Sequence, residues 1–223
     1  MTPRQRRFAC ACAGVIATHQ LTNGWYNAPL YEASKAGYWF LNAFMFLVVP
    51  TAALAALKRS TTGFRDFSID LPRQPVDWFD ILVLSAFLTV LLWLTYRTAT
   101  VLAYAALQSP RPTFYFAMTI PNAPILRPLV ASYSALTTGW VEEWTYKGAL
   151  YYLSTRYLPV SSRNAAFVMV SAVLFAVIHW ENGIAEVTGA FFLALLGALL
   201  FLKIRNVLPF AIAHAGIDLW HFL

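Results

Sequence analysis

Long apolar segments alternate with short polar ones along this chain. Six apolar segments are clear: residues 38–57, 81–107, 129–153, 165–179, 184–201 and 207–223. A helix needs about 20 mostly apolar residues to cross the hydrocarbon core of a membrane. A weaker segment, 8–19, follows a basic start. A signal peptide has the same pattern, but we interpret this segment as a first span. The pattern predicts an all-α, polytopic integral membrane bundle of about seven transmembrane helices.

Composition excludes the main alternatives to a membrane protein. Of the 223 residues, 59% are hydrophobic and 12% are charged, whereas a soluble domain has about 25% charged residues. So few charged side chains do not cover a water-facing surface, which excludes a soluble globular protein. The net charge of +6 would indicate nucleic acid in a soluble chain, but basic cytoplasmic loops explain it here. The predicted partner is the lipid bilayer, with no nucleic acid.

The basic residues concentrate in alternate loops when seven spans are counted from a cytoplasmic N-terminus. Eleven of the 16 Lys and Arg residues then lie in inward segments: Arg4, Arg6, Arg7, Lys58, Arg59, Arg65, Arg73, Arg156, Arg163, Lys203 and Arg205. Outward segments hold only Lys35, Arg111 and Arg127. Because cytoplasmic loops carry an excess of Lys and Arg, the N-terminus is predicted to be cytoplasmic and the C-terminus to face outward.

Two loops are long enough to have roles of their own. Residues 60–80 are polar and inward, and we expect them at the membrane interface. Residues 108–128 are outward and rich in proline and aromatic side chains. Loops of this length are often functional. This loop either covers a cavity that opens outward or lies along the membrane surface as an interfacial strap.

Ionisable residues inside the predicted spans mark a candidate site, since each is costly to insert into a membrane. Residues 142–147, with the sequence EEWTYK, lie in the middle of one span. Glu143 and Lys147 are four residues apart with the acid first, which favours an ion pair on one helix face. Glu142 points elsewhere with no partner on its own helix, as suits a general base. The alternative is that both glutamates only bond to neighbouring helices.

Two further clusters lie later in the chain. His179 ends the apolar segment 165–179. A histidine in that place is, by itself, most often structural. His214 and Asp218 are one turn apart on the last span, so they share one face of an otherwise apolar helix. We expect that face to point at a cavity or at a polar partner.

Two chemistries fit a glutamate, two histidines and an aspartate inside a bundle. In the first, a glutamate assisted by a histidine deprotonates water, and the other histidine with the aspartate stabilises the oxyanion, without any cofactor. In the second, two histidines and a carboxylate bind a catalytic zinc ion. The spacing does not choose between them, although the helical HExxH signature of zinc proteases is absent.

The three clusters, in this order, resemble the motifs of a known family. EExxx(R/K), FxxxH and HxxxN or HxxxD, each on its own apolar helix, are similar to those of the CAAX protease and bacteriocin-processing family. These are glutamic-type intramembrane endopeptidases, and they include the type II CAAX prenyl endopeptidases. The resemblance covers residues 129–223. It implies a helical bundle with a polar cavity open to one membrane face, and a site that works without metal.

The resemblance also implies a role for each site residue. Glu142 would activate the water with help from His179, and Glu143 would be the second glutamate of the first motif. His214 and Asp218 would form the oxyanion hole.

Two residues depart from the family pattern. Lys147 stands where the first motif usually has arginine, so it pairs with Glu143 without a planar fork. Asp218 stands where the prenyl endopeptidases have asparagine. Since an aspartate donates a hydrogen bond only when it is protonated, Asp218 either donates in that form or serves to orient His214.

We therefore expect one membrane domain, with N-terminal spans and loops in residues 1–127 and a catalytic four-helix core in residues 128–223. The expected function is an intramembrane endopeptidase that hydrolyses a peptide bond in a membrane-anchored protein or peptide. The alternatives are a zinc-dependent membrane protease and a non-catalytic immunity or partner-binding membrane protein. A proton-coupled transporter is less favoured, because the chain shows no inverted repeat.

The predicted topology bears on the substrate. It places His179 near the outer face and His214 in the outward half of the last span, so the mouth of the site would face outward. Prenylated CAAX proteins are processed from the cytosolic face. A better fit is an exported protein cleaved near its C-terminal anchor, as for the sorting-type bacterial members that this chain resembles in size. The expected location is a bacterial inner (plasma) membrane.

Overall fold

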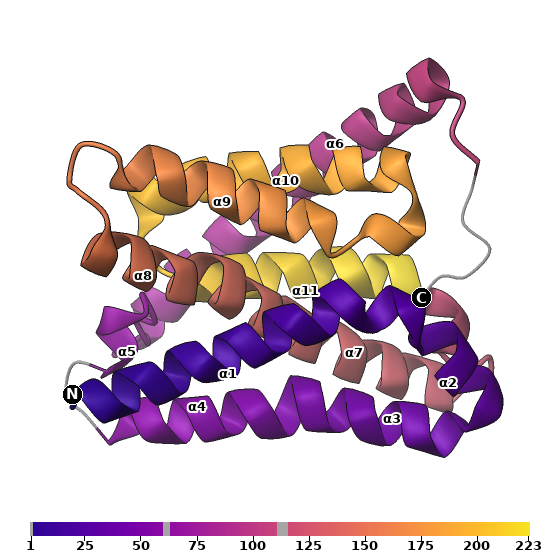
Figure 1. Cartoon of the computed structure of the whole chain (residues 1–223), viewed down its shortest axis with the longest axis horizontal. Helices are drawn as coiled ribbons and strands as arrows, with labels where there is room; N and C mark the ends of the chain where they lie inside the picture. The colour runs from indigo at the N-terminus through magenta and orange to yellow at the C-terminus, as the bar shows by residue number, and fades with distance from the viewer. Residues whose placement is uncertain (1, 60–62, 111–115) are drawn as a thin grey trace.

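The computed structural model describes residues 2–59, 63–110 and 116–223, and the regular elements in these ranges are all helices. Most of the longer α-helices run roughly along the long axis of the molecule, and α6 crosses behind them at an angle (Figure 1). Their bounds are α1 Pro3–Thr22, α2 Asn27–Ala33, α3 Lys35–Ala43, α4 Val49–Lys58, α5 Gly63–Asp66, α6 Pro75–Leu107, α7 Leu126–Glu143, α8 Leu150–Tyr157, α9 Arg163–Val177, α10 Ile184–Ile204 and α11 Leu208–Phe222. The predicted all-α class is confirmed.

Three helical stretches are long and apolar enough to cross a membrane: Lys35–Lys58, Pro75–Leu107 and Ile184–Ile204. The first of them joins α3 to α4 through a wider π-helical turn, Phe44–Val48, and a similar turn, Trp144–Ala149, joins α7 to α8. The molecule is therefore an all-α membrane bundle.

The other four predicted spans are also helical, with differences that have simple causes. The first, α1, is longer than the predicted 8–19, because it begins at Pro3 and includes the basic start. The helical stretch formed by α7, its π-helical turn and α8 contains the charged EEWTYK segment, so this stretch is less apolar than the three long spans. The helices α9 and α11 have 15 residues each, or about 22 Å at 1.5 Å per residue. The chain turns after Val177, so the predicted helical end at His179 is two residues too far.

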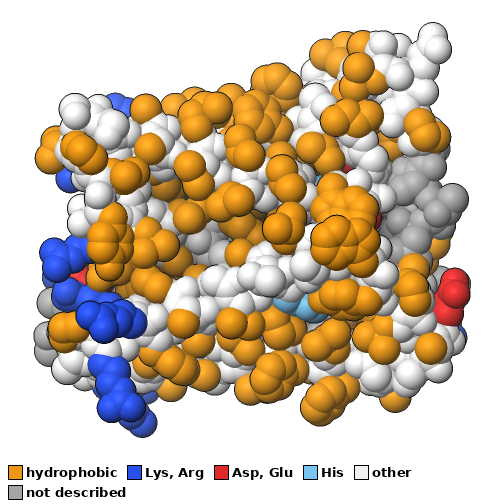
Figure 2. Space-filling view, viewed as in Figure 1, with side chains coloured by type: hydrophobic (Ala, Val, Ile, Leu, Met, Phe, Trp, Pro, Cys, Tyr) orange, Lys and Arg blue, Asp and Glu red, His pale blue; other side chains and the backbone are white. Residues whose placement is uncertain are grey.

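Basic side chains gather at one end of the bundle, where they surround the start of α1 (Figure 2). Arg6 forms an ion pair with Asp66 of α5 at 3.0 Å. The Asn206 amide, in the α10–α11 turn, donates to the Asp70 carbonyl at 3.0 Å. The α8–α9 loop lies at the same end in Figure 1. The segments predicted to be inward thus share one end, as expected if all seven helical segments traverse the bundle.

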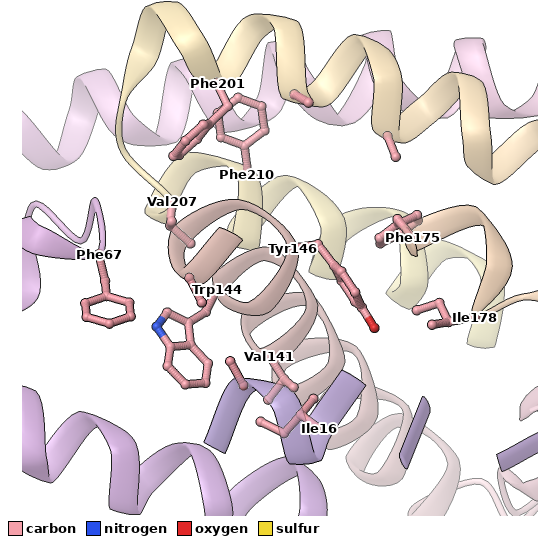
Figure 3. Packing of buried hydrophobic residues seen from close by; sticks show 14 of the residues in the cluster. Ile16, Phe67, Val141, Trp144, Tyr146, Phe175, Ile178, Phe201, Val207 and Phe210 are labelled. Carbon is pink, nitrogen blue, oxygen red and sulfur yellow. The ribbon is translucent and has the colours of Figure 1, made fainter. Parts of the chain in front are cut away.

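The junction of α7 with its π-helical turn lies in the centre of the core, and the side chains of residues 141–149 are all buried. Around it, Trp144 packs towards Phe67 beside α5, and Tyr146 packs edge-on against Phe175 of α9, with ring centroids 5.7 Å apart (Figure 3). The EEWTYK segment is therefore surrounded by protein on every side.

A close helix crossing brings the glutamates to α11. A Cβ atom on Gly139 would lie 2.8 Å from the Ala215 backbone nitrogen and 2.9 Å from the Ala211 carbonyl oxygen. Only a residue without a side chain allows this approach, which is the way small residues let membrane helices pack closely. Gly139 thus places the end of α7 against the part of α11 that carries His214.

Candidate active site

The ion pair predicted from the four-residue spacing forms at the centre of the bundle. Lys147 Nζ pairs with Glu143 Oε2, and both side chains are about 2% exposed. The other oxygen, Glu143 Oε1, lies 3.0 Å from His214 Nδ1. Lys147 also faces the Phe210 ring, 5.3 Å from its centroid, a cation–π distance. Glu143 is therefore engaged on both oxygens and holds the His214 ring in place.

Glu142 has a different environment, supplied by α1. Gln20 Nε2 donates to Glu142 Oε1 at 2.7 Å, and Tyr146 Oη donates to Gln20 Oε1 at 2.9 Å. Glu142 Oε2 is buried and accepts no hydrogen bond from the described residues, and it lies 3.7 Å from His214 Nε2. Sequence reasoning missed Gln20, because it stands one residue beyond the predicted segment 8–19. The only signal was its place in a short polar run at the end of that segment.

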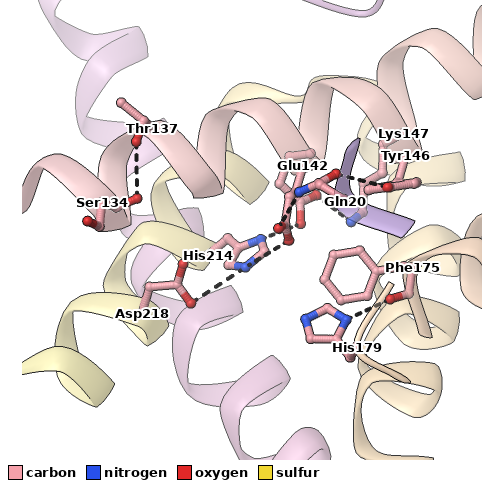
Figure 4. A network of polar contacts seen from close by, with 11 residues as sticks. Gln20, Ser134, Thr137, Glu142, Tyr146, Lys147, Phe175, His179, His214 and Asp218 are labelled. Atoms are coloured by element: carbon pink, nitrogen blue, oxygen red, sulfur yellow. Dashed lines mark hydrogen bonds and ion pairs between the residues drawn. The ribbon is translucent and has the colours of Figure 1, made fainter. Parts of the chain in front are cut away.

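His214 lies between the acidic groups of two helices (Figure 4). Its Nδ1 faces Glu143, while its Nε2 lies 3.7 Å from both Glu142 Oε2 and Asp218 Oδ1. The one-turn spacing of His214 and Asp218 on α11 puts both on the face that meets α7, as the sequence pattern predicts. The two motifs from α7 and α11 thus form one polar cluster.

His179 approaches the same space from the turn after α9. Its Nδ1 lies 2.8 Å from the Phe175 carbonyl oxygen, so Nδ1–H donates there and Nε2 is left as an acceptor. The Phe175 ring packs on His179 and His214, with centroids 5.0 and 5.8 Å away. Within the described residues, no hydrogen bond or ion pair joins His179 directly to Glu142. Any assistance must pass through a molecule held between them.

A cavity of about 260 Å³ contains this cluster and is lined by Glu142, His179, His214 and Asp218. Further polar residues line it: His19, Gln20, Asn23, Asn27, Asn42, Glu181, Asn182, Glu186 and His221. Many of these belong to the end of α1, the α9–α10 turn and the end of α11, which lie opposite the basic end in Figure 1. The cavity is therefore displaced towards the end of the bundle opposite the basic cluster.

The loop of residues 108–128 contributes to this cavity. Phe116 and Ala117 are among the lining residues, and the Phe116 ring packs against Phe222 at 5.5 Å. Residues 111–115 of this predicted loop lie outside the described residues. The structure therefore places the middle of this loop, at Phe116 and Ala117, in the cavity wall.

Glu181 is a lining residue that sequence reasoning also missed. It lies in the turn Trp180–Asn182 between α9 and α10, and its Oε2 is buried and finds no hydrogen-bond partner among the residues that the structure describes. Burial raises the pKa of this carboxyl to about 7. The turn is attached to α1, because Trp180 Nε1 donates to the Leu21 carbonyl oxygen at 2.9 Å. In the sequence, Glu181 looks like an ordinary loop acid.

The zinc alternative concerns the same residues. In the part of the chain that the structure describes, no group of three or more His, Cys, Asp or Glu side chains is arranged to hold a metal ion. His179 approaches the cavity from the turn after α9 and His214 from α11, and the Phe175 ring packs against both.

Comparison with known families supports the motif assignment. Residues 124–220 match the sequence model of the Rce1-like family, described as type II CAAX prenyl endopeptidase Rce1-like. The matched segment begins just before α7 and contains all three motifs. No curated protein and no solved structure matches the chain. The family resemblance predicted from the motifs is confirmed for this segment.

Proposed function

We propose that this chain is an intramembrane endopeptidase in which Glu142 activates water for attack on a peptide bond. The Rce1-like match supports a CAAX-type membrane protease in general, acting on a membrane-anchored protein in a lipid bilayer. One observation carries the specific mechanism. Glu142 Oε2 is a buried carboxylate oxygen with no hydrogen-bond partner among the described residues. It belongs to a cavity that also contains His179, His214 and Asp218.

In the proposed reaction, a water molecule bound at Glu142 Oε2 gives one proton to the carboxylate, and its oxygen attacks the scissile carbonyl carbon. Nε2 of His179 accepts the second hydrogen of this water as a hydrogen bond and so orients it. The resulting tetrahedral intermediate collapses when Glu142 returns its proton to the leaving amine. The products are a new carboxyl terminus and a new amine.

His214 supplies the oxyanion contact. Glu143 accepts a hydrogen bond from Nδ1–H, and the charged ring presents a second N–H, at Nε2, to the developing negative oxygen. Asp218 lies 3.7 Å from the same Nε2 and orients the ring. Lys147 neutralises Glu143, so Glu142 is the carboxylate that remains for proton transfer.

The proposed substrate is an exported protein cleaved near its C-terminal membrane anchor. The cavity lies towards the end opposite the basic side chains, and the positive-inside rule puts basic ends in the cytoplasm. With a cytoplasmic N-terminus in a bacterial plasma membrane, the cavity then opens to the outside. This geometry fits an exported substrate better than a prenylated protein presented from the cytosol.

The test uses the purified full-length chain in lipid vesicles. The probes are a prenylated CAAX peptide and anchored proteins extracted from membranes of the producing cells, and new C-termini are read by mass spectrometry. We expect Glu142→Gln to abolish cleavage, while Glu32→Gln, at an exposed position of α2, leaves it unchanged. Cleavage that survives Glu142→Gln contradicts the mechanism. Cleavage that a chelator abolishes and zinc restores establishes the metal-dependent alternative.

A further inference from the structure

The first helix, outside the segment that matches the family, contributes a side chain to the site. Gln20 is 2% exposed and bridges two residues of the EEWTYK segment, which lies more than 120 positions later in the chain. Tyr146 Oη donates to its Oε1 at 2.9 Å, and its Nε2 donates to Glu142 Oε1 at 2.7 Å. Because the Tyr146 hydroxyl donates to the amide oxygen, the amide nitrogen is the atom turned towards the carboxylate.

We propose that Gln20 is a positioning residue that holds Glu142 as a carboxylate with one oxygen fixed and the other free. The inference rests on the proposed function, in which Glu142 is the base. A buried carboxylate that accepts an N–H hydrogen bond is stabilised in its charged form. Since the contact is made at Oε1, it favours the orientation of the Glu142 side chain in which Oε2 is the oxygen left without a hydrogen bond from the described residues.

The other groups near Glu142 do not duplicate this contact. Three of these groups follow Glu142 in its own helical stretch: Glu143, Tyr146 and Lys147. Two come from α11, His214 and Asp218. His179 comes from the turn after α9. Glu143 and Lys147 pair with each other, and Glu143 also contacts His214 Nδ1. His214 Nε2 approaches the free Oε2 at 3.7 Å, beyond hydrogen-bonding distance. Among the described residues, Gln20 therefore provides the direct side-chain hydrogen bond to Glu142, and it adds no charge.

The first experiment reads the carboxyl group itself and needs no substrate. Infrared difference spectra of the full-length chain in vesicles are recorded across a pH series, and the Glu142 carboxyl band is identified as the one that Glu142→Gln removes. In Gln20→Met the donor is lost, so we expect the midpoint of this band's titration to move to higher pH. Gln20→Glu keeps the size of the side chain but puts a second carboxyl beside that of Glu142. The two carboxyls then share a proton, so we expect the midpoint to move to higher pH in this variant as well.

A matched control separates positioning from general loosening of the cavity. Asn42 is another buried amide in the cavity lining, 8% exposed, and it accepts a hydrogen bond from Tyr133 at 3.4 Å. Asn42→Leu is expected to leave the Glu142 band where it is in the wild-type protein. An unchanged midpoint in either folded Gln20 variant overturns the proposal, and so does an equal shift in Asn42→Leu.

The second experiment measures catalysis. Loss of a hydrogen bond to a buried charged group predicts a fall in kcat of about 10- to 100-fold in Gln20→Met, with KM nearly unchanged. The acid limb of the pH–rate profile moves to higher pH. A purely structural role would instead lower the amount of folded protein and leave the profile of the remainder unchanged. If no variant and no wild-type sample cleaves anything, the proposed function fails, while the infrared titration still decides the role of Gln20.

Discussion

The Glu143–Lys147 pair is the most deeply buried charge pair in the described part of the chain, and its energetics can be tested directly. Lys147→Met leaves the Glu143 carboxylate buried without its counter-charge, which predicts a loss of about 3–5 kcal/mol in unfolding free energy. The double variant Lys147→Met, Glu143→Gln should recover most of this loss. Unfolding in detergent, followed by circular dichroism, gives both values. A double variant as unstable as the single one contradicts the interpretation.

The folding stability of the protein should depend on pH through Glu181. Its pKa is raised by burial from 4.5 to about 7, so the folded chain holds this proton more tightly than the unfolded chain. Folding stability should therefore fall as the pH rises from about 4.5 to about 7, and this contribution is constant above that window. The wild-type minus Glu181→Gln difference in unfolding free energy, measured across the pH series, isolates this contribution. A flat difference contradicts the assignment.

At the scale of elements, the α7–α11 crossing decides whether the site assembles. A methyl group at position 139 would meet the α11 backbone at 2.8–2.9 Å, and backbone cannot move aside as a flexible side chain does. Gly139→Ala should therefore push α7 and α11 apart, at a cost of about 1–3 kcal/mol, and separate Glu142 from His214.

The measurement compares cleavage rate and unfolding of Gly139→Ala with those of Gly14→Ala. Gly14 is also in a helix, but nothing lies within 4 Å of an added Cβ atom. Replacing a helical glycine by alanine there should be neutral or stabilising, by up to about 1 kcal/mol. Equal activity in the two variants would show that the close crossing is not needed for the site.

The elements also show which parts of the site a single sequence can reveal. The contacts of Glu143 with Lys147 and of His214 with Asp218 were predictable, because one-turn spacing on a helix fixes which side chains share a face. Gln20 was not, because its contact joins α1 to α7 and no local periodicity encodes such a pairing. Glu181 was not predictable either, because its burial depends on the packing of the α9–α10 turn against α1.

The whole molecule explains why the helix count was harder to predict than the fold class. Hydropathy identifies the long apolar rods, such as α6 and α10, from composition alone. It is weaker for α7 and the π-helical turn after it, because Glu142, Glu143 and Lys147 lie there, buried inside the protein. It is also weaker for the short helices α9 and α11, whose length the hydrophobic pattern does not fix.

The orientation of the bundle is a prediction at this scale. Single cysteines are introduced at Arg59, at the basic end, and at Glu32, at the opposite end. Both positions are exposed. With a cytoplasmic N-terminus, an impermeant maleimide added to intact cells should label Glu32→Cys and should label Arg59→Cys only after permeabilisation. The reverse pattern would place the cavity mouth in the cytoplasm and remove the argument for an exported substrate.

The central claim is that Glu142 hydrolyses a peptide bond in membrane-anchored proteins of the cell. The most direct measurement is a survey of C-terminal peptides in membranes and medium from cells that make wild-type or Glu142→Gln protein at equal abundance. The account predicts that a small set of anchored proteins loses its cleaved form in Glu142→Gln, with new C-termini close to the anchor. An unchanged peptide set, under conditions where loss of the gene has an effect, would contradict the protease and favour a binding or immunity role.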